Sequence, residues 1–170
     1  IFGLSAMTCI QQSIMNLGIL MVQGLVNSFG VAVMAAFAAG VKIDTLAYSP
    51  VQDFGNAFST FIAQNYGAGK KERIHAGIKS AGLMVAIFCV FISSMVFMAA
   101  EQFMGIFVDS ENMEVIKIGV NYLRIEGSCY IGIGILFLLY GYYRAMTKPG
   151  MSVVLTVISL GTRVVLAYFL

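Results

Sequence analysis

The chain has 170 residues, of which 59% are hydrophobic and 11% are charged, and its formal net charge is +2. Soluble domains normally carry about 25% charged residues, so this chain, with a mean hydropathy of +0.89, lacks the polar surface that water requires. The composition therefore excludes an ordinary soluble domain, and the small net charge gives no reason to expect a nucleic-acid partner.

Five segments are apolar enough to cross a bilayer, which takes roughly 20 mainly apolar residues. We expect helices over about residues 4–27, 31–66, 78–100, 115–144 and 151–170. The second is longer than a hydrocarbon core, so it should tilt, protrude or bend. Pro50 is the expected place for a bend because proline removes a backbone donor. The sequence thus predicts an all-α, polytopic membrane helix bundle that forms a single membrane domain over residues 1–170.

Charged residues orient these helices. Basic residues follow the second and fourth helices, whereas residues 101–114 include acids and no Lys or Arg. Because short cytoplasmic loops are enriched in basic residues, we expect residues 67–79 and 144–150 to be cytoplasmic. The turn near residue 28 and the loop 101–114 are then external. The chain starts without Met and stops inside an apolar segment, so we expect a fragment of a longer protein.

Few residues could support catalysis or metal binding. Cys9, Cys89 and Cys129 lie in apolar segments without metal-ligand spacing, and we expect buried free thiols. The one histidine, His75, lies in the basic stretch, and no P-loop or Gly-x-Ser-x-Gly motif occurs. We therefore expect no enzymatic activity, no cofactor and no metal site.

Polar side chains follow one face of the first predicted helix. Steps of about 100° per residue place them in one sector: Ser5, Gln12, Asn16, Gln23 and Asn27. Amides without partners are costly in hydrocarbon, so this face must point at other helices or at water. The stripe either joins helices through hydrogen bonds or lines a solute cavity.

The second predicted helix has a comparable polar face, made of Lys42, Thr45, Ser49, Asp53, Asn56 and Thr60. Asp44 points roughly the opposite way. Ionisable groups at membrane depth are functional candidates by default. The alternatives are an ion pair between helices and, for Asp53, a solvated position at an interface.

The fourth predicted helix aligns one carboxylate with aromatic and basic residues: Glu126, Tyr130, Ile133, Phe137, Tyr140 and Arg144. A carboxylate beside aromatic rings suits a lipophilic cation, although the tyrosines could equally be packing residues. Gly127, Gly134 and Gly141 recur every seven residues, which favours close helix approach or a flexible helix.

Three stretches resemble the multidrug and toxic compound extrusion (MATE) family of transporters. They are Gln23–Gly30 with Lys42–Asp44, the run Gln64-Asn65-Tyr66-Gly67-Ala68-Gly69-Lys70 continuing to Arg73, and Gly141–Ala145 with Arg163–Tyr168. The resemblance implies a twelve-helix transporter built from two six-helix lobes, of which this chain would supply five helices of the second. Members export amphipathic, often cationic compounds in exchange for protons or sodium ions by alternating access.

The resemblance also implies a location and partners. We expect a multi-pass protein of the bacterial cytoplasmic (inner) membrane whose partners are membrane lipid, a small amphipathic or cationic substrate and the missing N-terminal lobe. The coupling ion would be a proton or a sodium ion. Some sodium-coupled members carry an acid in the helix that corresponds to the first one here, which has none.

We assign three groups of candidate residues. Gln12, Asn16, Gln23, Asp53 and Tyr130 are expected to line the substrate cleft. Lys42, Asp44 and Glu126 are the electrostatic or coupling candidates. The cytoplasmic signature comprises Gln64, Asn65, Gly67, Gly69, Lys70 and Arg73. The alternatives are a flippase for lipid-linked saccharides or another lipid, and a polytopic protein that transports nothing.

Overall fold

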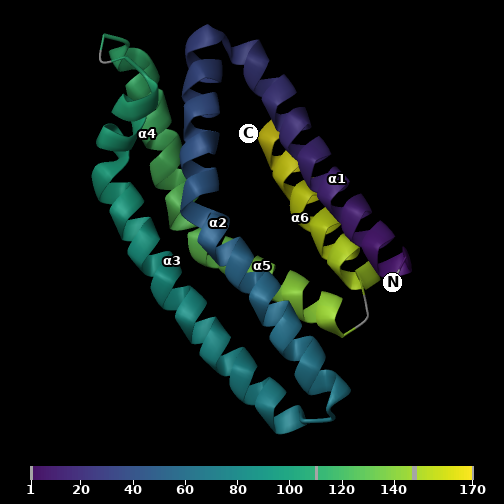
Figure 1. The fold of residues 1–170 in the computed structure, drawn as a ribbon. Helices are drawn as coiled ribbons and strands as arrows, with labels where there is room; N and C mark the ends of the chain where they lie inside the picture. Colours follow the sequence, from purple (N-terminus) through teal and green to yellow (C-terminus); the bar gives the residue numbers. More distant parts are fainter. Residues whose placement is uncertain (1, 110, 147–148, 170) are drawn as a thin grey trace.

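The computed structural model describes residues 2–109, 111–146 and 149–169, which form helices joined by short connections (Figure 1). The elements are α1 (Phe2–Val26), a 3-10 turn η1 (Asn27–Phe29), α2 (Val31–Gly67), α3 (Lys71–Phe107), α4 (Met113–Ser128), α5 (Tyr130–Ala145) and α6 (Pro149–Phe169). Within these residues no strand occurs, which confirms the all-α prediction.

Length and composition identify the membrane-crossing candidates among the described residues. Three helical segments qualify alone, namely Cys9–Phe29, Val31–Gly67 and Lys71–Phe107. The pair α4 and α5 qualifies together as a fourth, bent by 52°, and α6 contains a shorter apolar stretch, Gly150–Thr162. The molecule is a membrane helix bundle, as predicted.

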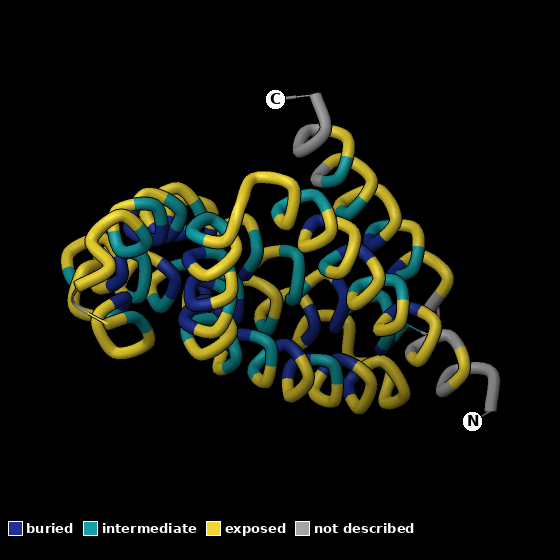
Figure 2. The backbone as a smooth tube through the Cα atoms, turned by 90° about the horizontal axis from the view of Figure 1, so that it is seen from above, coloured by how far each residue is buried: buried dark blue, intermediate teal, exposed yellow. Residues whose placement is uncertain are grey.

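Helix α2 is the centre of the bundle. It packs against α3, α4 and α5, whereas α1 lies along α6 and meets α2 mainly at their shared end (Figure 1). Buried residues face the inside of this arrangement and exposed ones surround it (Figure 2). The main apolar core lies between α2, α3, α4 and α5 and includes Val51, Cys89, Val96, Met104 and Leu123.

The connections alternate between two ends of the bundle. The α2–α3 turn and the end of α5 lie toward the bottom of Figure 1, and the α1–α2 turn lies at the opposite end with the end of α3. This alternation agrees with the topology expected from the charges. The assignment of the basic end to the cytoplasm stays a prediction.

The boundaries of the third helix were predicted wrongly. α3 begins at Lys71 rather than near residue 78. It is kinked at Ala99, where φ is −106° and ψ is 17°, close to the expected end near residue 100, and its helical residues then extend to Phe107. Nothing between Lys71 and Lys79 breaks a helix, and Glu72 in the first turn favours its start through the helix dipole. Arg73 and Lys79 therefore lie on a helix, and the loop predicted over 67–79 shrinks to a short turn.

That short turn is a Schellman motif. Gly69 has a φ of +69°, the Gly69 N–H donates to the Tyr66 carbonyl at 3.1 Å, and the Lys70 N–H donates to the Asn65 carbonyl at 2.9 Å. The left-handed conformation favours glycine because any Cβ is strained there. The Asn65 side chain is buried and donates to the Phe61 carbonyl at 2.8 Å, so it also stabilises the helix end.

The fourth predicted helix, 115–144, is two helices. α4 ends at Ser128, Cys129 has φ −93° and ψ −3°, and α5 starts at Tyr130. The Ser93 hydroxyl of α3 donates to the Gly127 carbonyl at 2.8 Å, which satisfies a carbonyl in the last turn of α4. Gly–Ser pairs are common sites of helix kinks, and Gly127–Ser128 is such a pair.

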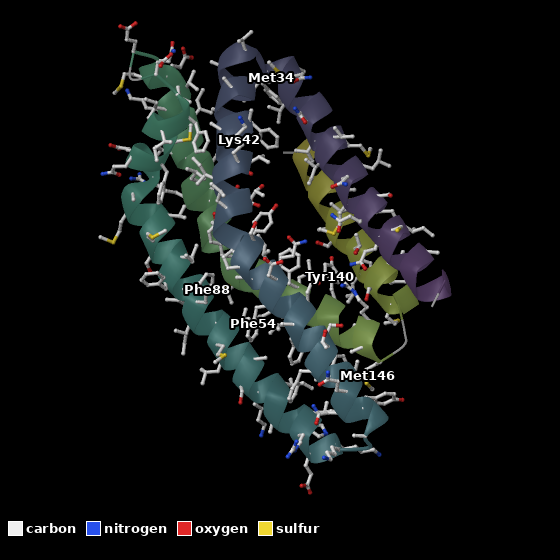
Figure 3. The ribbon with its side chains drawn as sticks, in the orientation of Figure 1. Met34, Lys42, Phe54, Phe88, Tyr140 and Met146 are labelled. Atoms are coloured by element: carbon white, nitrogen blue, oxygen red, sulfur yellow. The ribbon has the colours of Figure 1, made fainter. Side chains whose placement is uncertain are left out.

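Helix α2 remains continuous through Pro50. Its axis changes direction between Lys42 and Phe54 (Figure 3), which agrees with the bend expected at this proline. At about 1.5 Å per residue its 37 residues extend about 55 Å, well beyond a hydrocarbon core.

Glycines allow α5 to cross its neighbours closely, which agrees with one of the two expectations for the seven-residue repeat. A Cβ on Gly141 would lie 2.5 Å from the Gly55 carbonyl oxygen of α2, and one on Gly134 would lie 2.6 Å from Val85 of α3. A Cβ on Gly127 would meet Val96 at an ordinary 3.6 Å. The first two glycines therefore set the helix spacing.

Candidate functional site

The centre of the candidate site is a buried carboxylate–phenol pair. Asp44 of α2 is 4% exposed and Tyr130 of α5 is 3% exposed. The Tyr130 hydroxyl donates to Asp44 Oδ1 at 2.5 Å. Tyr130 is the first residue of α5, so the break after α4 carries its side chain to α2.

A second carboxylate lies at the same place. Asp44 and Glu126 line one cavity of about 40 Å³ together with Tyr48 and Tyr122. The cavity is also lined by apolar residues of α1 and α2, namely Ile19, Val22, Phe37 and Val41. Both carboxylates interact electrostatically with the Tyr130 phenol. The site thus joins α1, α2, α4 and the start of α5.

Close packing positions one wall of this cavity. A Cβ on Gly40 would lie 2.6 Å from the Tyr122 ring, so glycine is what admits the ring against α2. Phe37 packs edge-on against the same ring with centroids 5.6 Å apart. Tyr122 is thereby held beside the two carboxylates.

This arrangement suits the binding of a proton or a small cation. Two carboxylates repel each other more strongly in a protein interior than in water, and a positive charge between them relieves that repulsion. Tyr48 and Tyr122 line the same cavity, and a phenol oxygen can serve as a neutral ligand or a hydrogen-bond partner. A volume of about 40 Å³ fits an ion or a water molecule and is too small for an organic substrate.

Lys42, the third coupling candidate, lies elsewhere. Its side chain is exposed, and its Nζ lies 5.9 Å from the centroid of the Phe107 ring of α3. Asp44, two residues further along α2, points into the bundle. The structure therefore brings Asp44 and Glu126 together and separates Lys42 from them.

The five residues predicted to line a substrate cleft fall into two groups. Tyr130 is buried with Asp44, while Gln12, Asn16, Gln23 and Asp53 are exposed. Gln12 also lines a small pocket beside Arg144. The side chains of Ser5 and Arg163, and residue Lys148, lie outside what the structure describes.

The signature residues at the α2–α3 turn have structural roles. Gly69 and the backbones of Asn65 and Lys70 form the Schellman motif, and Gln64 O accepts from the Ala68 N–H at 3.1 Å. The side chains of Gln64, Lys70 and Arg73, and the backbone at Gly67, are exposed.

The expectation of three buried thiols was wrong for two of them. Cys89 is 2% exposed, but Cys9 and Cys129 are exposed on the described surface, and all three are free. Cys129 lies between α4 and α5, and its side chain is outside the apolar core.

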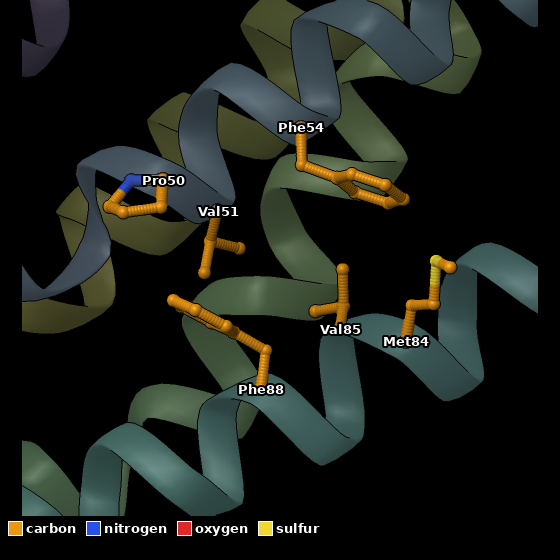
Figure 4. Close-up of a pocket in the computed structure, with 6 residues that line it drawn as sticks. All are labelled: Pro50, Val51, Phe54, Met84, Val85 and Phe88. Carbon is orange, nitrogen blue, oxygen red and sulfur yellow. The ribbon is translucent and has the colours of Figure 1, made fainter.

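The larger cavities are apolar. One of about 350 Å³ lies between α2 and α3 and is lined by Pro50, Val51, Phe54, Met84, Val85 and Phe88 (Figure 4). A neighbouring groove of about 510 Å³ extends from Phe54 and Met84 to Arg73. Neither contains the carboxylates, so the polar site and the large apolar volumes are separate.

Sequence comparisons relate the chain to a known family. The model of the MatE family matches residues 4–169. The chain is 26% identical over 150 residues to "Probable multidrug resistance protein YpnP" of Bacillus subtilis (strain 168), an alignment that covers 88% of this chain and 33% of that protein. It is 23% identical over 117 residues to "Probable multidrug resistance protein NorM" of Thermotoga maritima, covering 68% of this chain and 25% of that protein.

The fold defines a multi-pass helical membrane protein with a buried acidic site. The family match covers nearly the whole chain, and the chain therefore belongs to the MatE family. It spans a third or less of the length of these two relatives.

Proposed function

We propose that this chain is part of a secondary transporter that exports amphipathic, often cationic compounds in exchange for protons or sodium ions. Membership of the MatE family supports a transport role, and the names of the two relatives support multidrug efflux. We place the protein in the bacterial cytoplasmic membrane, with membrane lipid and an N-terminal lobe of the same protein as its partners.

The observation that carries the proposal is the acidic cavity at the α4–α5 break. Transporters commonly place their ion and substrate sites where membrane helices are interrupted. Here the interruption brings the Tyr130 phenol to Asp44 and places Glu126 in the same cavity. Ionisable groups inside a membrane protein are rare and are usually functional.

A mechanism follows from this geometry. A cation that binds between Asp44 and Glu126 draws α2 and α4 together, and its release lets the carboxylates repel. Because the pair spans separate helices, occupancy favours one helix arrangement over the other, which is the requirement for alternating access. The exposed amides Gln12, Asn16 and Gln23 of α1 would face the substrate path.

The test is export of a fluorescent cationic dye from efflux-deficient bacteria that express the full-length protein, with and without a proton ionophore and with and without sodium. We expect export that needs one of the two ions, and loss of most of it in Asp44→Asn and in Glu126→Gln. Asp109→Asn is the matched control, since Asp109 is exposed near the end of α3. Unchanged export in both site variants would remove this cavity from coupling.

The same assay separates the proposed antiporter from both alternatives, which differ from each other in other respects. A flippase for lipid-linked saccharides or another lipid predicts no export of any cationic dye and a strongly cationic cleft. A non-transporting bundle predicts no export and tolerance of the polar stripes to apolar residues of matched size.

A further inference from the structure

A second polar pocket lies away from the acidic cavity. It encloses about 20 Å³ between α1, α2 and α5, and its polar lining comprises Gln11, Gln12, Gln52, Asn56, Tyr140 and Arg144. The lining includes one cation and no carboxylate. On α2, Asn56 lies 11 residues before the helix end, or about 16 Å along the axis, so the pocket belongs to the half that carries the basic turn.

Arg144 is the charged group of this pocket. Its Nη1 donates to Asn56 Oδ1 at 3.1 Å, and its Nε is buried without a hydrogen-bond partner among the described residues. A guanidinium carries five N–H donors, and the one hydrogen bond that it makes to a described side chain is that to Asn56. Asp53, one turn before Asn56, does not line the pocket.

Gln11 brings a second polar side chain to this pocket. It is 5% exposed and lines the same space as Arg144. Its amide carries N–H₂ donors and an oxygen that accepts. An acceptor between the N–H₂ group and the guanidinium could therefore bind both donors.

Two of the helices that line this pocket, α2 and α5, are fixed against each other. Gly55 of α2 and Gly141 of α5 cross in contact within the pocket wall, and Tyr140 beside them is tied to α6, since the Ser152 hydroxyl reaches its carbonyl at 3.5 Å. Tyr140 lies in the middle of the bundle (Figure 3). The backbone that carries Arg144 is therefore fixed relative to α2, where Asn56 lies.

We propose that the pocket at Arg144 binds an oxyanion, a carboxylate or phosphate group, with the guanidinium as its charge partner and the Gln11 amide as an additional donor. Arginine recognises such groups through paired N–H donors, and these charge-assisted bonds are stronger than neutral ones. The free volume of about 20 Å³ has room for about one oxygen-sized atom, so a single oxygen of such a group would enter and the rest of the ligand would lie outside.

This proposal rests on the proposed transport function and specifies its substrates. Helix α2 lines both the acidic pocket, through Asp44, and the basic pocket, through Asn56. These two residues are 12 positions apart, which is about 18 Å along the helix axis. The transporter would accept amphipathic compounds that carry an anionic group as well as those that are only cationic. An anionic lipid headgroup has the same chemistry and is the other possible source of the oxyanion.

The experiment uses the full-length protein in vesicles of zwitterionic lipid and two rhodamine dyes, one with a free carboxylate and the other its methyl ester. We expect Arg144→Gln to raise the KM of the carboxylate dye about tenfold or more and to leave that of the ester within about twofold, given the strength of hydrogen bonds to charged groups. Arg144→Lys should fall between. Arg124→Gln is the control, because Arg124 is exposed over the Phe97 ring at 5.3 Å.

Three further readouts complete the test. Gln11→Met keeps the side-chain volume and should also raise the KM of the carboxylate dye and not that of the ester. This second variant keeps the test valid if Arg144→Gln does not fold. Adding phosphatidylglycerol should inhibit the carboxylate dye in the wild type and not in Arg144→Gln if a lipid headgroup occupies the pocket. Equal shifts of both dyes in the arginine variants, or no shift of either, would overturn the oxyanion site.

Failure of transport itself gives a different result. If the wild type moves neither dye, the proposed function fails, and equilibrium binding of the carboxylate dye to the purified protein, followed by fluorescence anisotropy, tests the pocket alone. Binding that is weakened about tenfold by Arg144→Gln and not by Arg124→Gln would then support the site. Equal binding by all three proteins would refute it.

Discussion

Replacing Gly141 by alanine tests whether the α2–α5 crossing fixes the bundle. The new Cβ would lie 2.5 Å from the Gly55 carbonyl oxygen and 3.6 Å from the Ser59 Cβ, whereas ordinary contacts begin at 3.4 Å. The obstacle is backbone rather than a flexible side chain, so the two helices must separate by most of an ångström.

The expected cost follows from two opposing effects. Overpacking a close contact costs about 1–3 kcal/mol. Replacing glycine within a helix by alanine returns about 0.5–1 kcal/mol. We therefore expect a net loss of about 1–2 kcal/mol in the free energy of unfolding.

The matched control is Gly132→Ala, on the same helix, where a Cβ would meet nothing within 4 Å. This variant should be as stable as the wild type or more so. The measurement is thermal unfolding of the full-length protein in detergent, in which Gly141→Ala should unfold several degrees below Gly132→Ala. Equal midpoints for the two variants would show that α2 and α5 do not cross at these glycines.

Three other substitutions test local features by the same unfolding measurement. Gly69→Ala should cost about 1–2 kcal/mol because of its left-handed backbone, while Gly67→Ala, at a helical glycine with open space around it, should not destabilise; equal effects would contradict the Schellman turn. Ser93→Ala should cost about 1 kcal/mol by removing a hydrogen bond to the end of α4, and Ser94→Ala, whose hydroxyl bonds within its own helix, should cost less. Tyr130→Phe should cost about 1.5–3 kcal/mol because it removes the donor to a buried aspartate, and wild-type stability would refute that contact.

Much of the fold could be predicted because membrane helices depend on length and apolar composition. Helix α2 starts at Val31 and ends at Gly67, and glycine-containing turns mark both ends. Both ends lie within one residue of the positions expected from the sequence. The alternation of basic and acidic connections gave the arrangement of the two ends. These signals are local, so a single sequence contains them.

The break between α4 and α5 was missed because the polar stripe continues through it at helical spacing. No proline marks it, and the Gly127–Ser128 pair is a weak signal beside the seven-residue glycine repeat. The partner that stabilises the break, Ser93, lies on another helix. A contact of this kind depends on tertiary packing and is not visible in the local sequence.

The candidate site was predicted in part. Asp44 was correctly separated from the exposed face of α2 that contains Lys42 and Asp53. Its proximity to Glu126 and Tyr130 could not be deduced, since it depends on how α4 and α5 bend against α2. The aromatic stripe of the fourth predicted helix also divides at the break, which places Tyr130 with the carboxylate.

The pocket at Arg144 shows the same limit. Gln11 was not among the cleft residues expected from the sequence, because it lies beside the polar stripe of the first helix. The structure shows it buried and directed into the space between α1, α2 and α5. Only the packing of α1 reveals that this amide and the guanidinium share one pocket.

In the proposed mechanism, the cavity lined by Asp44 and Glu126 couples ion movement to export. The most direct measurement is ion flux through the full-length protein in sealed vesicles, driven by a gradient of a cationic dye and followed with a pH-sensitive or sodium-sensitive indicator. The wild type should move protons or sodium ions against the dye, and the double variant Asp44→Asn, Glu126→Gln should not. Ion flux of wild-type size in the double variant would contradict the account.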